Sequence, residues 1–209
     1  MRRIPLSVKL IYTAWMAVWV PVYWVHSGPE NFLWLCDVAN ILVGVALWLE
    51  SPLLISAQAV GVLLVQILWC GDYFGRLVLG YHPIGGTEYM FDEAKPLYLR
   101  LFSLFHAAMP PLLLWAVKRL GYDRRGWLLQ TAITFVLLPA TWLIVSPDRN
   151  INWVWMPFGK PQDLLPPPVY LLALCFLYPL LLYIPTHLLL SRWAVSPQTP
   201  PAARGSRSG

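Results

Sequence analysis

Six long stretches of the chain are almost wholly apolar, and they determine its predicted architecture. Each holds about 18 to 22 residues, enough for a helix to cross the ~30 Å hydrocarbon layer of a membrane. None alternates apolar and polar positions as a membrane β-strand would. A backbone in lipid must also satisfy its own hydrogen bonds, which favours helices. We predict membrane-spanning helices at residues 6–25, 32–49, 52–70, 97–117, 127–145 and 169–190.

The composition supports this reading and excludes other classes. Of the 209 residues, 58% are hydrophobic and 12% are charged, against about 25% charged in a typical soluble domain. A disordered chain or a single soluble core does not fit these values, and three cysteines are too few for a disulfide-built module. The predicted fold class is all-α: a polytopic integral membrane bundle of six transmembrane helices in one domain, residues 1–195. Residues 196–209, rich in Pro, Ser and Arg, are predicted to be a disordered tail.

The basic residues indicate how the bundle is oriented. With six spans both termini lie on one side, and ten of the 15 Lys and Arg residues fall there. Cytoplasmic segments are enriched in Lys and Arg, so both termini are predicted to be cytoplasmic, and a bacterial inner membrane fits best. The net charge of +5 then reflects topology, and no nucleic-acid partner is expected. The two long connections, 71–96 and 146–168, fall on the outer side.

A few polar residues inside the spans carry the candidate chemistry. Ionisable groups within a membrane are costly and by default mark functional sites. Residues three or four positions apart share one face of a helix, so two polar stripes are expected in the outer halves of the second and fourth spans. Both spans enter from the outside, and their stripes could meet in one outward-facing cavity. The stripes are Cys36, Asp37 and Asn40, and Arg100, Ser103 and His106.

Structural explanations remain open for each of these residues. Asp37 and Arg100 could form an ion pair that neutralises both at low dielectric. His106 could be a hydrogen-bonded packing residue. Cys36 could be a small buried hydrophobe or could form a disulfide with Cys70. Three further polar residues could simply form hydrogen bonds between neighbouring helices, as such residues commonly do: Ser103, Gln58 and Gln66.

Short motifs give the chain a family resemblance. The segment Trp34–Ala39, W-L-C-D-V-A, is similar to an H-L-C-D-x-A helix opening in YwaF-type bacterial integral membrane proteins. Phe105-His106 starts an apolar, proline-containing half-helix, and Asn152-Trp153 followed by Lys160-Pro161 resembles an N-Y…K-P stretch after the fifth helix of that family. Over about residues 32–190 the chain resembles these proteins and a group of bacterial multi-pass "membrane-associated" proteins. More distantly it resembles the androgen-induced membrane hydrolases and a related cysteine-dependent phospholipid acyltransferase.

The resemblance implies catalytic roles for three residues. In the characterised relatives a nucleophile early in the chain works with a histidine on a later helix. Carried over, Cys36 would be the nucleophile and His106 the base, with Asp37 or Asn152 orienting the histidine. Trp34 stands where the bacterial relatives have histidine, so any role of that residue is not carried over.

Three kinds of function therefore remain open. The first is a membrane-embedded lipid ester hydrolase or acyltransferase that opens to the outer leaflet and takes a lipid or fatty-acyl substrate. The second is a transporter or binding protein for a small solute, and the third is a non-catalytic scaffold or assembly partner. No cofactor is expected, and the four histidines lack the spacing of a metal site. The predicted binding residues are Asn40, Arg100, Ser103 and Asn152.

Overall fold

The computed structural model describes residues 3–194, and within that range the chain forms helices and loops without a strand. Five of these helices are long and apolar enough to cross a membrane. They are α1 (Leu6–Ser27), α3 (Pro52–Leu79), α6 (Gly126–Ile144) and two interrupted helices over Leu97–Leu120 and Pro167–Ala194. The all-helical prediction is confirmed, and the five apolar helices are compatible with a multi-pass membrane protein. The predicted tail at 196–209 lies outside the described residues.

The second predicted span is shorter than expected. It begins as a 3₁₀ turn, η1 (Pro29–Leu33), and continues as α2 (Leu35–Leu49) after Trp34, whose backbone is extended. At 15 residues α2 is about 22 Å long, less than the ~30 Å hydrocarbon layer. The third span is longer than predicted. α3 continues past Cys70 to Leu79 and ends at Gly80, whose φ of 80° suits glycine.

Two of the membrane-length helices are interrupted. The fourth span divides into α4 (Leu97–Phe102) and α5 (Phe105–Leu120), with the break at residues 103–104. The last span consists of α7 (Pro167–Tyr178), a π-helical segment η5 (Pro179–Tyr183) and α8 (Ile184–Ala194). Pro179 has no N–H to donate, and the wider π turn begins at this residue.

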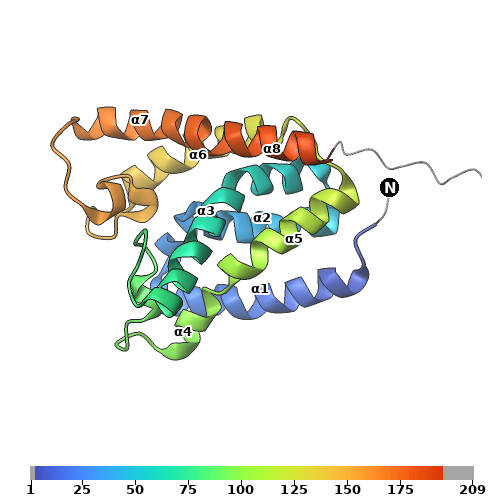
Figure 1. The fold of residues 1–209 in the computed structure, drawn as a ribbon, viewed down its shortest axis with the longest axis horizontal. Coiled ribbons are helices and arrows are strands. Elements are labelled where there is room, and N and C mark those ends of the chain that lie inside the picture. The colour runs from blue at the N-terminus through green and yellow to red at the C-terminus, as the bar shows by residue number, and fades with distance from the viewer. Residues whose placement is uncertain (1–2, 195–209) are drawn as a thin grey trace, which may run out of the picture.

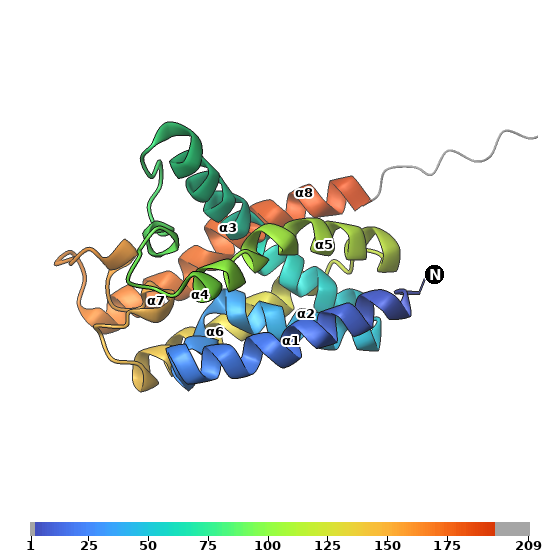
Figure 2. The ribbon, with the colours of Figure 1, turned by 90° about the horizontal axis from the view of Figure 1, so that it is seen from below.

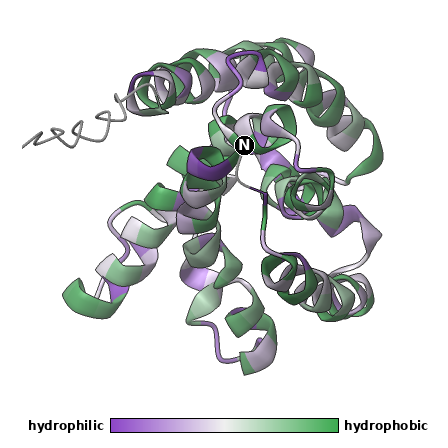
Figure 3. Ribbon diagram, turned by 90° about the vertical axis from the view of Figure 1, so that its right-hand side faces the viewer, coloured by the Kyte–Doolittle hydropathy of each residue, from purple (hydrophilic) through white to green (hydrophobic). Residues whose placement is uncertain are grey.

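The central element of the bundle is α3, which packs against α2, α5, α6 and α8 (Figure 1). Its contact with α6 is close because Gly126 has no side chain. A Cβ at that position would lie 2.8 Å from the backbone nitrogen of Ala57. Apolar positions run along the helices in Figure 3, and many large apolar side chains are exposed, with Val78, Val136 and Leu143 among the most exposed. Such an exterior is compatible with lipid as the surrounding solvent.

The two ends of the bundle differ in structure. The start of α1 and the end of α8 lie together at one end, and the long connections lie at the opposite end (Figure 1). The first connection contains η2 (Glu88–Met90), and the second contains η3 (Ile151–Trp153) and η4 (Pro157–Gly159). The last turns of α3 diverge from the other helices and lead into the first connection (Figure 2). The start of α2 and the break between α4 and α5 lie toward this looped end.

Candidate functional site

The start of α2 is held in place by Asn152 from η3. The Asn152 amide donates to the Leu33 carbonyl at 2.6 Å and accepts from the Leu35 N–H at 2.9 Å. The first N–H groups of a helix have no partner within the helix, so this side chain supplies one. Asn152 was predicted as a binding residue, and its contacts make it a residue that positions Cys36 and Asp37.

Asp37 is a buried carboxyl group with few partners. Its side chain is 2% exposed. Asn31 of η1 donates its amide to Oδ2 at 2.7 Å, and the Cys36 thiol lies 3.8 Å from Oδ1 in donating geometry. The structure thus provides Cys36 with a proton acceptor, Asp37, which Asn31 in turn orients. A thiol beside a carboxyl group that is itself held by an amide is a candidate for the nucleophile and base of covalent catalysis, although the thiol contact is long.

The ion pair considered between Asp37 and Arg100 does not form. Neither residue belongs to any of the four ion pairs found among residues 3–194. Arg100 instead donates Nη1 to the Met90 carbonyl at 3.2 Å. The Arg100 side chain is thus directed toward the loop around η2, which contains Met90.

His106 is held in one orientation by its surroundings. Its Nδ1 lies 2.8 Å from the Ser103 carbonyl, which can only accept, so Nδ1 carries a proton and the lone pair of the neutral ring is on Nε2. The ring stacks on Trp69 of α3, with centroids 4.8 Å apart and planes at 15°. Among the described residues, no hydrogen bond to Nε2 is found. This atom can therefore take a proton from a bound molecule.

Ser103 connects His106 to the region of α2. Its hydroxyl lies 3.1 Å from the Tyr23 hydroxyl of α1, and its carbonyl holds the imidazole. The helix that carries Tyr23, α1, packs against α2 and η1, which hold Cys36, Asp37 and Asn31. Within the described chain no hydrogen bond joins Cys36 and His106 directly. We call the six residues brought together here the polar cluster: Tyr23, Asn31, Cys36, Asp37, Ser103 and His106.

Asn40 lies outside the polar cluster. It lies one turn further along α2, where its side-chain and backbone oxygens both accept from the Tyr12 hydroxyl of α1. This contact joins α1 to α2 at a level farther from the looped end than the polar cluster. Cys36, Cys70 and Cys175 are all free thiols, so the disulfide considered between Cys36 and Cys70 is absent.

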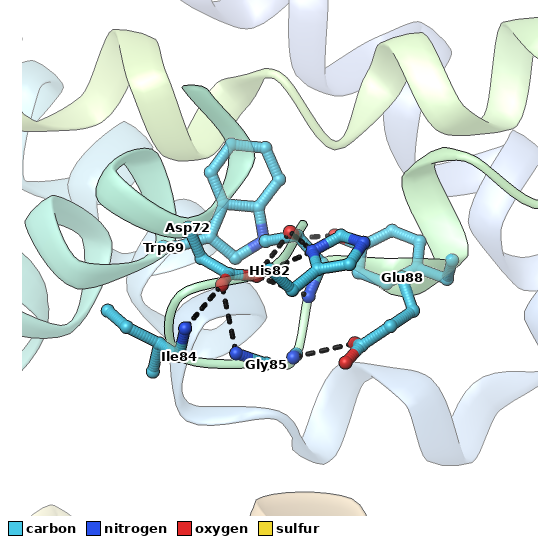
Figure 4. Close-up of polar contacts among 9 residues, drawn as sticks. Trp69, Asp72, His82, Ile84, Gly85 and Glu88 are labelled. Atoms are coloured by element: carbon cyan, nitrogen blue, oxygen red, sulfur yellow. Dashed lines mark hydrogen bonds and ion pairs between the residues drawn. The ribbon is translucent and has the colours of Figure 1, made fainter. Parts of the chain in front are cut away.

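A second buried carboxylate, Asp72, organises the first long connection. Its Oδ1 accepts from the Ile84 and Gly85 N–H groups at 2.8 and 2.9 Å, and its Oδ2 bonds Thr87 and the His82 ring (Figure 4). Sequence reasoning treated Asp72 only as one of several outer acids. The signal was the glycine-containing turn downstream, where Gly85 and Gly86 adopt φ values of 91° and 109°.

Trp69 links this loop to the polar cluster. Its indole Nε1 donates to the Tyr89 hydroxyl at 3.2 Å, and its ring stacks on His106. The next ring outward, Tyr73, stacks on Trp69 at 5.2 Å. The loop fixed by Asp72 therefore covers the side of α3 on which His106 rests.

Comparison with known proteins does not extend this description. No protein-family model, no curated protein and no solved structure matches the chain. The argument for function therefore rests on the geometry of the polar cluster.

Proposed function

We propose that the chain is a multi-pass protein of the cell membrane that crosses the bilayer six times. Five crossings would be the membrane-length helices, and the remaining one would be α2 extended by η1, which together cover residues 29–49. Both termini would face the cytoplasm, because the basic residues concentrate at their end of the bundle. The long outer loops and the polar cluster would then lie at the outer leaflet, and a bacterial inner membrane fits this arrangement.

Within that membrane we propose a lipid ester hydrolase or acyltransferase with Cys36 as the nucleophile. The Cys36 sulfur would attack the ester carbonyl carbon, forming a C–S bond while the C–O bond to the alcohol breaks. The thiol proton would pass to the departing alkoxide through Asp37 or His106. The resulting thioester would then transfer its acyl group to water or to another hydroxyl, which restores the thiol.

One observation carries this proposal: the only hydrogen-bond acceptor found for the Cys36 thiol within residues 3–194 is a buried carboxylate without a cationic partner. An uncompensated carboxylate is expensive in a membrane interior and is usually retained for proton transfer. The neutral imidazole of His106, with Nε2 unoccupied, supplies a second proton acceptor in the same cluster.

The proposal is tested by hydrolysis of p-nitrophenyl octanoate by the purified full-length protein in detergent. Cys36→Ala should abolish p-nitrophenol release, and His106→Ala should lower it by about 10²-fold or more. Cys175→Ala is the matched control, because Cys175 is a buried thiol that packs with Leu138 and Val154 and is not a member of the polar cluster, and it should retain wild-type activity. Equal activity in Cys36→Ala and wild type would refute the proposal.

A second candidate function, proton-linked movement of a small solute, is favoured by buried polar groups in α6 and in the π-helical segment η5. Tyr183 in the π segment bonds Thr134 of α6 at 2.6 Å, and Gln130 Oε1, one turn away, is buried without a partner. Proteoliposomes loaded with a pH-sensitive dye distinguish the two functions. Proton entry that is lost in Asp37→Asn and kept in Cys36→Ala would favour transport.

A further inference from the structure

Gln66 is the most conspicuous unpaired polar side chain in the described part of the bundle. It lies in α3, its exposed fraction is 0%, and neither its amide nitrogen nor its amide oxygen has a partner. A buried amide without hydrogen bonds destabilises the fold, because it has lost its bonds to water without replacing them. Packing alone would be better served by leucine at this position, so the amide indicates a bound molecule that supplies the missing bonds.

The position of Gln66 places that molecule beside His106. Residues three and four positions further along α3 both contact His106: the Trp69 ring stacks on the imidazole, and the Cys70 thiol donates to the His106 carbonyl at 3.8 Å. Residues i, i+3 and i+4 share a helix face, so Gln66 lies on this same face. About 5 Å along the helix axis separates its level from that of the imidazole.

The facing helix adds further unused hydrogen-bonding capacity at this level. Pro110 and Pro111 lie inside α5 and have no N–H, so they cannot donate to the carbonyls of His106 and Ala107 one turn earlier. The Cys70 thiol serves the first of these carbonyls. Three groups of α3 and α5 thus have unused hydrogen-bonding capacity. They are the Gln66 amide, the Ala107 carbonyl, which receives no N–H from Pro111, and Nε2 of His106.

These groups select a small, uncharged, hydrogen-bonding molecule. An amide and a carbonyl carry no net charge, His106 is neutral, and no lysine or arginine of the described chain is hydrogen-bonded to any of them. A water molecule or an alcohol hydroxyl can donate to His106 Nε2 and also bond the Gln66 amide. An anion would find no compensating charge here.

We propose that Gln66 and His106 bind the acyl acceptor, a water molecule or an alcohol hydroxyl, for the second half of the reaction. This inference rests on the proposed function. The acceptor oxygen attacks the carbonyl carbon of the Cys36 thioester and gives its proton to His106 Nε2. A C–O bond forms, the C–S bond breaks, and the sulfur takes the electron pair and then the proton from the imidazolium. Gln66 is a binding residue for the acceptor and has no part in acylation.

The experiment separates the two half-reactions. With p-nitrophenyl octanoate, the initial burst of p-nitrophenol reports acylation of Cys36, and the later linear phase reports deacylation. Gln66→Leu should keep the burst amplitude within about twofold of wild type and lower the linear rate at least tenfold. Added glycerol should accelerate the linear phase of the wild type and not that of Gln66→Leu. Gln58→Leu, the same substitution about 12 Å along α3, is the matched control and should retain both phases.

Different failures identify different errors. A wild-type protein that releases p-nitrophenol no faster than Cys36→Ala overturns the proposed function and the acceptor role together. A burst with a linear rate that falls no further in Gln66→Leu than in Gln58→Leu overturns only the role of Gln66. Melting temperature in detergent guards against misfolding: Gln66→Leu should melt within about 2 °C of wild type or above it, because no bond within the protein is lost. A fall of more than about 5 °C would show that the amide is bonded within the fold and would also overturn the inference.

Discussion

Two aspartates near the looped end of the bundle are almost equally buried and differ sharply in their partners. Asp72, 1% exposed, accepts from the backbone of residues 84, 85 and 87 and from the Thr87 and His82 side chains. Asp37, 2% exposed, accepts one amide hydrogen bond and has one long contact with a thiol. The first carboxylate is saturated by the fold, whereas the second keeps acceptor capacity. Saturation therefore distinguishes a carboxylate that builds structure from one available for chemistry.

The surroundings of the two groups explain the difference. Asp72 lies where α3 diverges from the bundle, and a glycine-containing loop wraps its carboxylate with N–H groups (Figures 2 and 4). Asp37 lies at the start of α2, whose position Asn152 fixes from outside the cluster. A rigid supporting contact that leaves the functional group free is typical of prepared binding and catalytic sites.

Removal of the Asp72 carboxylate should produce the largest loss of stability. In Asp72→Ala the Ile84 and Gly85 N–H groups and the Thr87 hydroxyl lose their acceptor, and each hydrogen bond to a charged group is worth about 1.5–3 kcal/mol. We expect a loss of about 3 kcal/mol or more in the free energy of unfolding, measured by thermal unfolding in detergent. Asp37→Asn retains an acceptor for Asn31 and should lose less than about 1 kcal/mol. Equal losses in the two variants would remove the distinction between the carboxylates.

Activity should show the opposite order. Asp37→Asn removes the acceptor of the Cys36 proton while it preserves shape, so the burst rate with p-nitrophenyl octanoate should fall by about 10²-fold. The Asp72→Asn variant, measured at a temperature where it remains folded, should retain a burst rate within about threefold of wild type. A burst rate in Asp37→Asn that matches wild type would remove Asp37 from the mechanism.

The support provided by Asn152 should have an intermediate effect. Asn152→Gly loses two hydrogen bonds to the start of α2, worth about 2 kcal/mol together. Asn152→Ala should lose about 1 kcal/mol more, because the backbone here has a φ of 54°, which glycine adopts without strain. Unfolding in detergent measures both losses. If Asn152→Ala loses no more stability than Asn152→Gly, the backbone at this position relaxes to a conformation that alanine adopts without strain.

An ion pair at the opposite end of the bundle should have the smallest effect. Lys9 donates to Glu50 at 2.7 Å, and this hydrogen bond lowers the pKa of the Glu50 carboxyl. A folded-state pKa below the unfolded value of about 4.3 gives stability that is present above that value and is lost as pH falls through the folded pKa. Glu50→Gln should therefore flatten the fall in melting temperature between neutral and acidic pH. An unchanged pH profile would show that the pair does not contribute.

The sequence predicted most of the bundle because long apolar runs have few alternatives in a chain of this composition. It placed α1 and α6 within about two residues of their observed bounds. It could not show that Trp34 interrupts the second run, because a break in backbone angles leaves no polar mark in an apolar segment. The extension of α3 to Leu79 was hidden for the opposite reason: Asp72 and Arg76 made that region resemble a loop.

The sequence identified most of the residues that belong to the candidate site, but it did not predict the contacts that these residues make between helices. Spacing along one helix placed Cys36 beside Asp37 and Ser103 beside His106, since helical periodicity is local. Whether Asp37 would contact Arg100 depended on contacts between distant segments: Arg100 bonds Met90 and Asp37 bonds Asn31, which periodicity within one helix does not reveal. Gln66 was interpreted as a link between helices, a role that its unpaired amide does not support.

The central claim is that the thiol beside the unsaturated aspartate is the reactive one. The most direct measurement is mass spectrometry of the intact and proteolysed protein after brief exposure to p-nitrophenyl octanoate and acid quench. We predict an octanoyl adduct on Cys36 in the wild type, which is greatly reduced in Asp37→Asn and retained in Asp72→Asn. An adduct spread equally over Cys36, Cys70 and Cys175, or no adduct on Cys36, would contradict the account.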